Sequence, residues 1–388
     1  MKNFNVAEFG VVPDGEKLQT AKIQAVLDLC KQGGGCVVFP EGIYRVSSLR
    51  LWSNTTVILE KGAVIEGSTD IRDYSDYPDT FGMVFYTDGQ LIPLHDGRQA
   101  RKEYRRAIFS AFAQKNIAIF GNDNSVIDGK DCFDFEGDEG FRGPHAVFFS
   151  GCDNIVLKGY TVRDAANFAH QLDNCRNVLI KNVKAEAGHD GVHINQCNNV
   201  IIEDCAFSTG DDCIAGINVC NVYVRNCILN TSCNMFRIGG QNVYISHCKM
   251  KGIGKYPHKL SLYQGNGKFS PAETGRRNTL FFMEFFASDI VPNDCGCNVT
   301  VSDCEIVDVD SCIHYEYNNP YALHTGSVLT EVRFENVKVK GLKKSSVVIA
   351  DPKRGLHAVM HNVTAESREG EPIELFVGGS ANISIVDS

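Results

Sequence analysis

The hydrophobic and polar positions between residues 154 and 245 repeat about every 22 residues. Each repeat begins with an asparagine followed by a short apolar run rich in β-branched residues. The starts are Asn154, Asn177, Asn199, Asn221 and Asn242, with steps of 23, 22, 22 and 21 residues. A fixed period of this length is typical of repeat proteins in which every repeat is one supersecondary unit. The pattern therefore predicts a parallel solenoid with one coil per repeat.

Strand-like runs continue the pattern toward both ends of the chain. They cover residues 4–6, 36–40, 56–60, 107–113 and 116–120, and the repeat resumes at residue 298 and ends near residues 382–386. Residues 20–30 carry a helical pattern whose apolar face holds Ile23, Val26, Leu27 and Cys30. A helix at the open end of a solenoid hides strand edges that could otherwise pair with another chain. We therefore expect one all-β domain over residues 1–388, a parallel β-helix with an N-terminal capping helix.

Two segments, residues 73–106 and 251–297, interrupt the rhythm and are too long to be simple turns. The second contains an aromatic cluster formed by Phe281, Phe282, Phe285 and Phe286. Insertions in a solenoid project from one face and commonly build the binding site. The alternative is that both segments pack as lids that touch no ligand.

The composition excludes several classes of partner. Hydrophobic residues make up 43% of the chain and charged residues 22%, as in globular proteins, and no run approaches the ~18 apolar residues needed to cross a bilayer. The formal net charge of −9 argues against binding nucleic acid, which needs an extended basic face. Because the first residues lack the apolar core of a secretion signal, we expect a cytoplasmic protein with no membrane partner. The sequence leaves the oligomeric state unknown.

The sixteen cysteines follow the repeat. Three lie two residues before a repeat start and four lie six residues after one: Cys152, Cys175 and Cys197, then Cys205, Cys227, Cys248 and Cys304. Because a free cysteine behaves as a small buried hydrophobe, we expect stacked, reduced thiols that fill the inside of the coils. No cysteine or histidine pair has the spacing of zinc ligands, so we expect no metal and no cofactor.

Acidic residues recur at one position of the repeat. Asp190, Asp212 and Asn234 each lie thirteen residues after a repeat start, and Asp211 precedes Asp212. Equal offsets on successive coils place these side chains one above another at the ~4.8 Å spacing of neighbouring strands. Repulsion between close carboxylates keeps one of them protonated near neutral pH, which supplies a general acid beside a general base. Inverting glycoside hydrolysis needs such a pair.

Two other interpretations of these aspartates remain open. Aspartate is common at turns, where its side chain bonds nearby backbone N–H groups. Clustered carboxylates also bind hard cations such as Ca²⁺.

The sequence resembles glycoside hydrolase family 28, the polygalacturonase and rhamnogalacturonase group. The likeness runs through FNVAEFGVVPDG, GGGCVVFPEGIY and IDGKDCFD, and is strongest in HDGVHINQCNNVIIEDCAFSTGDDCIA. The family's Asn-Thr-Asp motif keeps only its aspartate, at Gly188-His189-Asp190, whereas its Asp-Asp motif is intact at Asp211-Asp212. The resemblance implies a right-handed parallel β-helix. It also implies that Asp211 is the general acid and that Asp190 and Asp212 position and deprotonate the attacking water.

The chain departs from the family downstream of these motifs. Where the family has Gly-His-Gly ahead of an Ile-Gly pair, this chain has Cys233-Asn234-Met235, and an amide cannot titrate as histidine does. The family's Arg-Ile-Lys, which holds the uronate carboxylate, has no clean counterpart. Cationic side chains near the expected place can form a smaller carboxylate clamp. They are Arg237, Lys255, His258 and Lys259.

The sequence thus predicts an inverting, exo-acting glycoside hydrolase for pectin-derived oligosaccharides, with His189, Asn234, Arg237, His258 and Lys259 binding the substrate. One alternative is a carbohydrate-binding β-helix that has lost turnover. Another is a polysaccharide lyase or epimerase of the same architecture, for which Arg237, the only arginine of the repeat core near the aspartates, is the candidate base.

Overall fold

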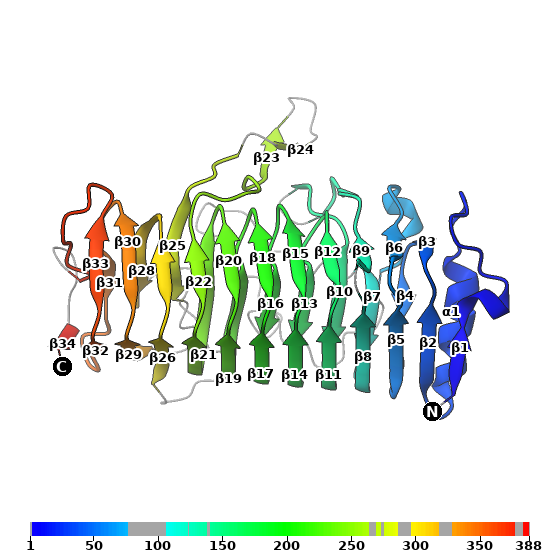
Figure 1. The fold of residues 1–388 in the computed structure, drawn as a ribbon, viewed down its shortest axis with the longest axis horizontal. Coiled ribbons are helices and arrows are strands. Elements are labelled where there is room, and N and C mark those ends of the chain that lie inside the picture. Colours follow the sequence, from blue (N-terminus) through cyan, green and yellow to red (C-terminus); the bar gives the residue numbers. More distant parts are fainter. Residues whose placement is uncertain are drawn as a thin grey trace.

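The computed structural model describes residues 2–76, 106–122, 124–137, 140–263, 269–272, 275–285, 296–317, 328–376 and 383–387. Its strands stack into a right-handed parallel β-helix that runs from the N-terminal end, covered by α1 (Thr20–Asp28), to β34 (Ile383–Asp387) near the C-terminus (Figure 1). The predicted fold class is confirmed. Among the described residues no helix combines the length and the apolarity that spanning a membrane requires.

Each complete coil contributes one strand to each of three parallel ladders. The first ladder carries the site described below. Its strands are β4 (Leu49–Arg50), β7 (Ala107–Phe112), β10 (His145–Ser150), β13 (His170–Asp173), β16 (Val192–Asn195), the first half of β19 (Ile214–Arg225), the first half of β21 (Asn234–Ser246), β25 (Thr279–Phe285), β28 (Val309–Glu316) and β31 (Val347–Ile349).

In the central coils, the strands of the second ladder begin one residue before the repeated asparagine. Its strands are β1 (Asn3–Asn5), β2 (Gly35–Phe39), β5 (Thr55–Leu59), β8 (Lys115–Gly121), β11 (Asp153–Lys158), β14 (Arg176–Lys181), β17 (Asn198–Glu203), the second halves of β19 and β21, β26 (Cys297–Ser302), β29 (Leu329–Glu335), β32 (Leu356–His361) and β34.

The third ladder closes the coil. Its strands are β3 (Gly42–Val46), β6 (Ala63–Gly67), β9 (Val126–Asp128), β12 (Thr161–Arg163), β15 (Lys184–Ala187), β18 (Ala206–Thr209), β20 (Ile228–Thr231), β22 (Lys249–Lys251), β27 (Glu305–Val307), β30 (Lys338–Leu342) and β33 (Thr364–Ser367). Short 3₁₀ helices lie outside the ladders at Val6–Phe9, Leu29–Lys31 and Ile71–Asp73.

The repeated asparagine has a conformational reason. Asn154, Asn177 and Asn199 have φ angles of 60°, 54° and 60°, a left-handed conformation that asparagine adopts more readily than most residues. Their side chains also bond along the ladder, as when Asn199 Nδ2 donates to Asn177 Oδ1 at 2.7 Å. Each asparagine therefore turns the chain into a new strand and pairs its own amide with the next coil.

The interior is filled by one continuous apolar core. The cysteines predicted to line the coils are buried, and Cys175 donates its backbone N–H to the Cys197 sulfur at 3.4 Å, which places successive thiols one above another. This confirms the predicted packing of these two columns of cysteines.

We expect the thiols to be reduced. Parallel neighbours keep their Cβ atoms near the ~4.8 Å strand spacing, outside the usual disulfide range of ~3.5–4.5 Å. Protein denatured without reductant should therefore titrate close to all sixteen thiols, matching a sample reduced beforehand. A native mass lower by several pairs of hydrogens would contradict this expectation.

The two predicted insertions have different outcomes. Residues 77–105 of the first lie outside the described residues. In the second, β23 (Leu260–Tyr263) and β24 (Phe269–Ala272) form an antiparallel hairpin that projects from the β-helix (Figure 1).

The placement of the aromatic cluster in this insertion was wrong, because β25 is a strand of the first ladder. Phe282 and Phe285 are buried in the core, and the Phe281 ring stacks on His314 at 4.8 Å. Phe286 lies outside the described residues.

Candidate active site

The predicted stack of Asp190, Asp212 and Asn234, called the column below, forms where a third-ladder strand of one coil leads into the first-ladder strand of the next. Val192 pairs with Ile214, and Ile214 pairs with Phe236, so Asp190, Asp212 and Asn234 occupy equivalent positions two residues earlier. The backbone N–H of Gly191 donates to the Asp212 carbonyl at 3.0 Å. The thirteen-residue offset therefore does correspond to stacking in space.

Three carboxylates meet at this column. One oxygen from each of Asp190, Asp211 and Asp212 lies within 4.8 Å of the others. Asp190 and Asp212 are 4% and 2% exposed, and the Asp211 side chain is 13% exposed. Three negative charges at this separation and burial would repel one another strongly, so the surrounding contacts decide which of them are ionised.

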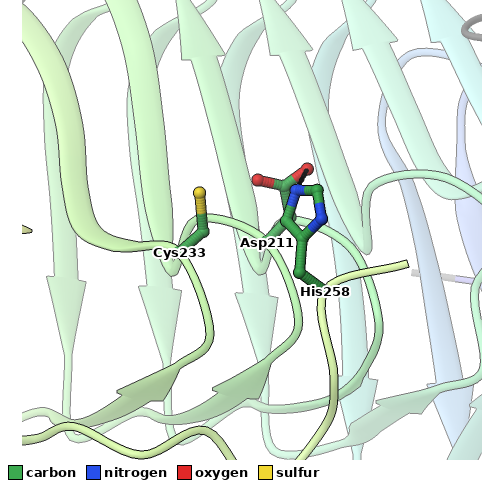
Figure 2. A group of neighbouring side chains, drawn as sticks. All are labelled: Asp211, Cys233 and His258. Carbon is green, nitrogen blue, oxygen red and sulfur yellow. Dashed lines mark ion pairs between the residues drawn. The ribbon is translucent and has the colours of Figure 1, made fainter. Parts of the chain in front are cut away.

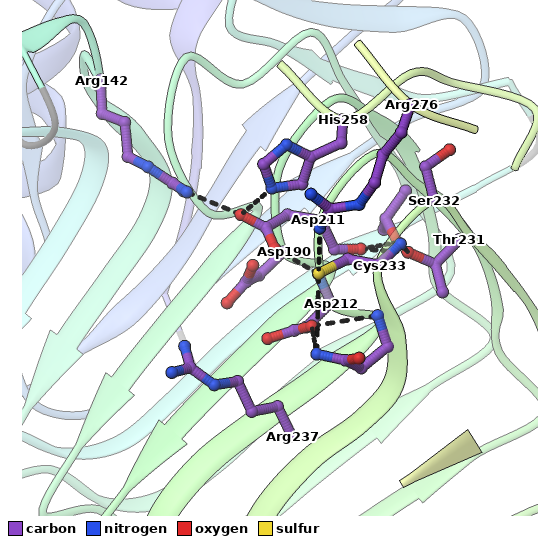
Figure 3. A network of polar contacts seen from close by, with 12 residues as sticks. Arg142, Asp190, Asp211, Asp212, Thr231, Ser232, Cys233, Arg237, His258 and Arg276 are labelled. Atoms are coloured by element: carbon purple, nitrogen blue, oxygen red, sulfur yellow. Dashed lines mark hydrogen bonds and ion pairs between the residues drawn. The ribbon is translucent and has the colours of Figure 1, made fainter. Parts of the chain in front are cut away.

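Asp211 is held by cations from outside its own turn. Arg142 Nη2 lies 2.6 Å from Asp211 Oδ2, and His258 Nε2 lies 3.7 Å from the same oxygen (Figure 3). Burial alone would raise the pKa of Asp211, but the positive charges of Arg142 and His258 outweigh it and hold that pKa well below its usual range. The hydroxyls of Thr209 and Thr231 donate to the Asp211 carbonyl and fix the turn.

Asp212 has the opposite environment. Its Oδ1 accepts two bonds from Asn234, one from the backbone N–H at 3.2 Å and one from Nδ2 at 2.8 Å. Burial, followed by the charges of Asp211 and Asp190, raises the pKa of Asp212 well above its usual value. The surroundings of these two neighbouring carboxyls thus shift their pKa values in opposite directions.

Asp190 is paired with a histidine that the sequence analysis did not single out. Asp190 Oδ2 lies 2.7 Å from His193 Nδ1, and the His193 ring stacks on Phe168 with centroids 4.5 Å apart. His193 was visible in the sequence as the second histidine of HDGVH, three residues after Asp190. Side chains alternate along β16, so Val192 and Ile194 point into the core and His193 points outward, toward Asp190.

His189, expected to bind substrate, lies in the wall behind the carboxylates. It is 2% exposed and packs against Phe141 and Phe133, with ring centroids 5.8 and 6.3 Å away. Burial, followed by the charge of Arg142, keeps the pKa of His189 well below its usual value. In this position the imidazole is neutral and its contacts are those of a packing residue.

The four cations expected to form one clamp are divided between three places. His258 and Lys259 lie near Arg142, and Lys259 Nζ bonds Asp131 Oδ2 at 2.7 Å. Arg237 lies on the other side of the carboxylates in Figure 3, with its Nε 3.3 Å from Glu284 Oε2. Lys255 is 59% exposed and lies 3.8 Å from Glu186.

Glu284 joins Arg237 and Asn234 to a further titratable group. Asn234 Nδ2 donates to Glu284 Oε2 at 3.3 Å, and Glu284 Oε1 lies 3.3 Å from His314 Nδ1. The hydrogen bond to Glu284 raises the pKa of His314. Its effect is larger than that of burial, which acts in the opposite direction. Asn234, predicted to touch substrate, therefore links Asp212 to a polar row on the next two coils.

Two groups of side chains in the described part of the chain have metal-ligand spacing. One is the three aspartates, and the other is Asp211, Cys233 and His258 (Figure 2). Protein cations already contact both, because Arg142 bonds Asp211 and Arg276 Nη2 lies 3.1 Å from the Cys233 sulfur. A divalent ion would have to compete with these guanidinium groups, so the geometry favours an ion-pair network.

Sequence reasoning missed Arg142, Arg276, Glu284 and His314. Arg142 belongs to the long connection between β9 and β10, and Arg276 to the irregular segment before β25. Neither residue lies in the repeat, so the 22-residue period gives no indication of their place. Arg142 and Arg276 reach the site from irregular segments, in addition to Arg237, which lies in the repeat core.

Comparison with known proteins agrees with this geometry. Residues 96–233 match the family model for glycosyl hydrolases family 28, and residues 3–73 match that for rhamnogalacturonase A/epimerase, pectate lyase-like proteins. The chain is thus similar to glycosyl hydrolases family 28 over about a third of its length. The first match includes Asp190, Asp211 and Asp212, so the three aspartates lie inside the region that resembles the family.

An exo-poly-alpha-D-galacturonosidase from Dickeya chrysanthemi is 32% identical to this chain over 128 residues, which is 33% of this chain and 19% of that relative. Among solved structures, a hyperthermoactive exopolygalacturonase from Thermotoga maritima has a TM-score of 0.67 at 16% identity, covering 99% of this chain and 91% of that one. A family 28 exopolygalacturonase from Yersinia enterocolitica has a TM-score of 0.61 at 18% identity, covering 100% of this chain and 78% of that one. At these identities the two structures show the shared fold.

Proposed function

We propose that this protein is a glycoside hydrolase that removes terminal uronic acid residues from pectin-derived oligosaccharides. The observation that carries the proposal is the buried group of Asp190, Asp211 and Asp212, in which the pKa of one carboxyl is raised and that of its neighbour is lowered. A protonated carboxyl beside ionised ones supplies the proton donor and the water-activating base that glycosidic cleavage needs.

Cleavage from a chain end is supported by the wall on one side of the carboxylates. The connection between β9 and β10 meets the segment after β22, because Lys259 Nζ bonds Asp131 Oδ2 and lies 4.6 Å from the centre of the Phe133 ring. Gly188 leaves room for the lysine, since a Cβ there would lie 2.8 Å from Lys259 Cε. A site walled on one side accepts the end of an oligosaccharide more easily than its middle.

A uronic acid fits the charges on this wall. Arg142, His258 and Arg276 lie on the same side of the aspartates (Figure 3). Lys259, the residue after His258, forms an ion pair with Asp131. A sugar carboxylate entering here would meet positive charge in a site of low exposure, where charge-assisted bonds are stronger than in water. The matched exo-poly-alpha-D-galacturonosidase supports the same substrate class.

Lys259→Ala should lower kcat/KM on digalacturonate by roughly one to two decades, because one charge-assisted bond contributes about 1.5–3 kcal/mol. A neutral disaccharide, if it is cleaved at all, should be affected little. Asp131→Asn is the matched control, since it weakens the tie but keeps the lysine charge. If both variants lose the same activity on charged and neutral substrates, Lys259 acts only as a structural tie.

Hydrolysis is expected to invert the anomeric configuration. Oxygens within 4.8 Å are closer than the ~6.5–9.5 Å carboxyl separation expected for inverting enzymes, so the pairwise spacing alone does not favour inversion. With three carboxylates, two can hold the attacking water while the third is the acid. Two oxygens that each accept a hydrogen bond of ~2.7–2.8 Å from one water lie roughly 4.5 Å apart, which agrees with the observed spacing. Proton NMR of the first product decides the point, and a retained anomer or a trapped glycosyl-enzyme would exclude this course.

The decisive experiment is a screen of the purified protein against defined pectic and neutral oligosaccharides. Release of a single terminal uronic acid supports the proposal. Binding without any released reducing sugar would identify a carbohydrate-binding protein instead. An unsaturated product that absorbs ultraviolet light would identify a lyase, for which Arg142 and Arg237 are the arginines on either side of the aspartates.

A further inference from the structure

The backbone around Asp190 is fixed on both sides of this residue. The Asp190 carbonyl accepts from the backbone N–H of Ala169 at 2.9 Å. The carbonyl of the next residue, Gly191, lies 2.9 Å from His170 Nδ1. His170 is fully buried, and burial lowers its pKa to about 4, so its ring is neutral near pH 7. Its Nδ1–H therefore donates to Gly191, and its Nε2 accepts from the Tyr160 hydroxyl at 3.1 Å.

His193 restricts the part that the backbone leaves free to rotate, the side chain of Asp190. Its Nδ1 lies 2.7 Å from Asp190 Oδ2, and the two residues are 7% and 4% exposed. Because an ionised carboxylate can only accept hydrogen bonds, the imidazole supplies the proton of this contact from Nδ1. A short bond from a donor to an ionised oxygen is among the stronger hydrogen bonds in proteins and fixes the orientation of both groups.

The His193 ring is itself held in place. It stacks on Phe168 with centroids 4.5 Å apart and planes 13° apart. The guanidinium carbon of Arg142, which forms an ion pair with Asp211, lies 5.2 Å from the centre of the same Phe168 ring. One buried aromatic ring thus supports the partners of two of the three carboxylates.

We infer that His193 is a positioning residue for Asp190: its Nδ1–H orients the carboxylate toward the attacking water, and stacking on Phe168 fixes the direction of that N–H. The inference rests on the proposed glycosidase function and deepens it by naming the group that orients its base. It also bears on a departure from the family pattern. The Asn-Thr-Asp motif keeps only its aspartate here, and the residue before that aspartate, His189, packs in the wall behind the carboxylates.

His193 acts through the carboxylate and exchanges no proton in the reaction. When water attacks the anomeric carbon, a proton of that water passes to Asp190, and the Nδ1–H stays on His193. A donor to one oxygen stabilises the ionised form of a carboxyl. Asp190 is therefore held as an oriented base before the substrate arrives.

Two substitutions at His193 separate positioning from packing. Asparagine carries Nδ2 at the place of the imidazole Nδ1 and can make the same donation, whereas leucine keeps apolar bulk but has no donor. We expect His193→Leu to lower kcat on digalacturonate by roughly 10–100-fold, the cost of a hydrogen bond to a charged group, and His193→Asn to lower it by less than about fivefold. KM should change little in either variant, because the buried ring does not reach the substrate.

A role in packing alone predicts the reverse order. Leucine would then be tolerated better than asparagine, in kcat as well as in the thermal unfolding midpoint. A His193→Asn variant less active than His193→Leu would therefore overturn the inference. His357→Leu is the matched control and should keep wild-type kcat, since His357 is an exposed histidine of β32 that contacts Ser384.

The pH profile tests the cause. Without the donor, the ionised form of Asp190 loses a stabilising contact, so the acidic limb of kcat/KM should move to higher pH in His193→Leu. It should stay near its wild-type position in His193→Asn, which keeps a donor but cannot titrate. Both variants keep the other charged and titratable groups around the three carboxyls, which are Arg142, His189, Arg237, His258, Arg276 and Glu284. A limb that moves equally in the two variants would contradict the role given to the Nδ1–H.

Nitrogen NMR of isotope-labelled histidine tests the contact without turnover. The signal that is missing from His193→Asn identifies His193, and it should show a protonated Nδ1 at neutral pH. An unprotonated Nδ1 would refute the inference whatever the substrate is. Wild-type protein that shows the protonated Nδ1 but cleaves no oligosaccharide would instead overturn the proposed function.

Discussion

Replacing Asp190 by asparagine is expected to lower kcat by roughly 10²–10⁴-fold, the usual cost of losing a proton-transfer group. The change removes the carboxylate that accepts the proton of water but keeps the shape of the side chain. Because Asp190 is 4% exposed and lies 2.7 Å from His193, an isosteric replacement can retain the contact and the fold. Initial rates on digalacturonate and the thermal unfolding midpoint, measured together, check this result.

The matched control is Asp303→Asn. Asp303 is an exposed turn aspartate with a φ of 51° that pairs with His247 and Asn336 far from the column. It should keep wild-type activity, because asparagine tolerates the same backbone conformation. An Asp190→Asn variant with near wild-type kcat would remove Asp190 from the mechanism.

Replacing Phe207 by alanine is expected to lower the free energy of unfolding by about 3–5 kcal/mol, the cost of a cavity left by a buried aromatic ring. Phe207 is 1% exposed in β18 and packs beneath the turn that holds Asp190, since a Cβ on Gly191 would lie 3.2 Å from its ring. Urea unfolding should show a lower midpoint, and kcat should fall because the turn loses its support.

Two comparisons make this result interpretable. Phe207→Leu leaves a smaller cavity and should cost less, whereas Phe135→Ala changes a ring that is 51% exposed and should leave the midpoint almost unchanged. Equal losses for Phe135→Ala and Phe207→Ala would contradict the assignment of Phe207 to the core.

Local rules made the coil and the column predictable. The asparagine starts mark residues with a left-handed φ, and an alternating apolar run follows each of them, so the repeat can be counted from the sequence. Counting thirteen residues onward reaches Asp190 and Asp212, because parallel pairing in constant register converts equal offsets into stacked positions. The same rule placed the buried cysteine columns.

The irregular segments could not be counted. Arg142 and Asp211 are separated by 69 residues in the chain, yet their side chains are 2.6 Å apart. Nothing in the residues around Arg142 indicates that its connection folds back over a turn three coils later. Likewise, the asparagine starts mark the strands of the second ladder, so they did not reveal that Phe281, Phe282 and Phe285 belong to a first-ladder strand, β25.

The sequence by itself therefore determined the β-helix and the stacking of Asp190, Asp212 and Asn234, because both depend only on the period of the repeat. The tertiary structure decided which charged and hydrogen-bonding groups surround each carboxyl of the site. It brought Arg142 and His258 to Asp211, Asn234 to Asp212 and His193 to Asp190. Whether a buried carboxyl keeps its proton depends on charges within a few ångströms of it, and two of these neighbours come from segments that follow no repeat.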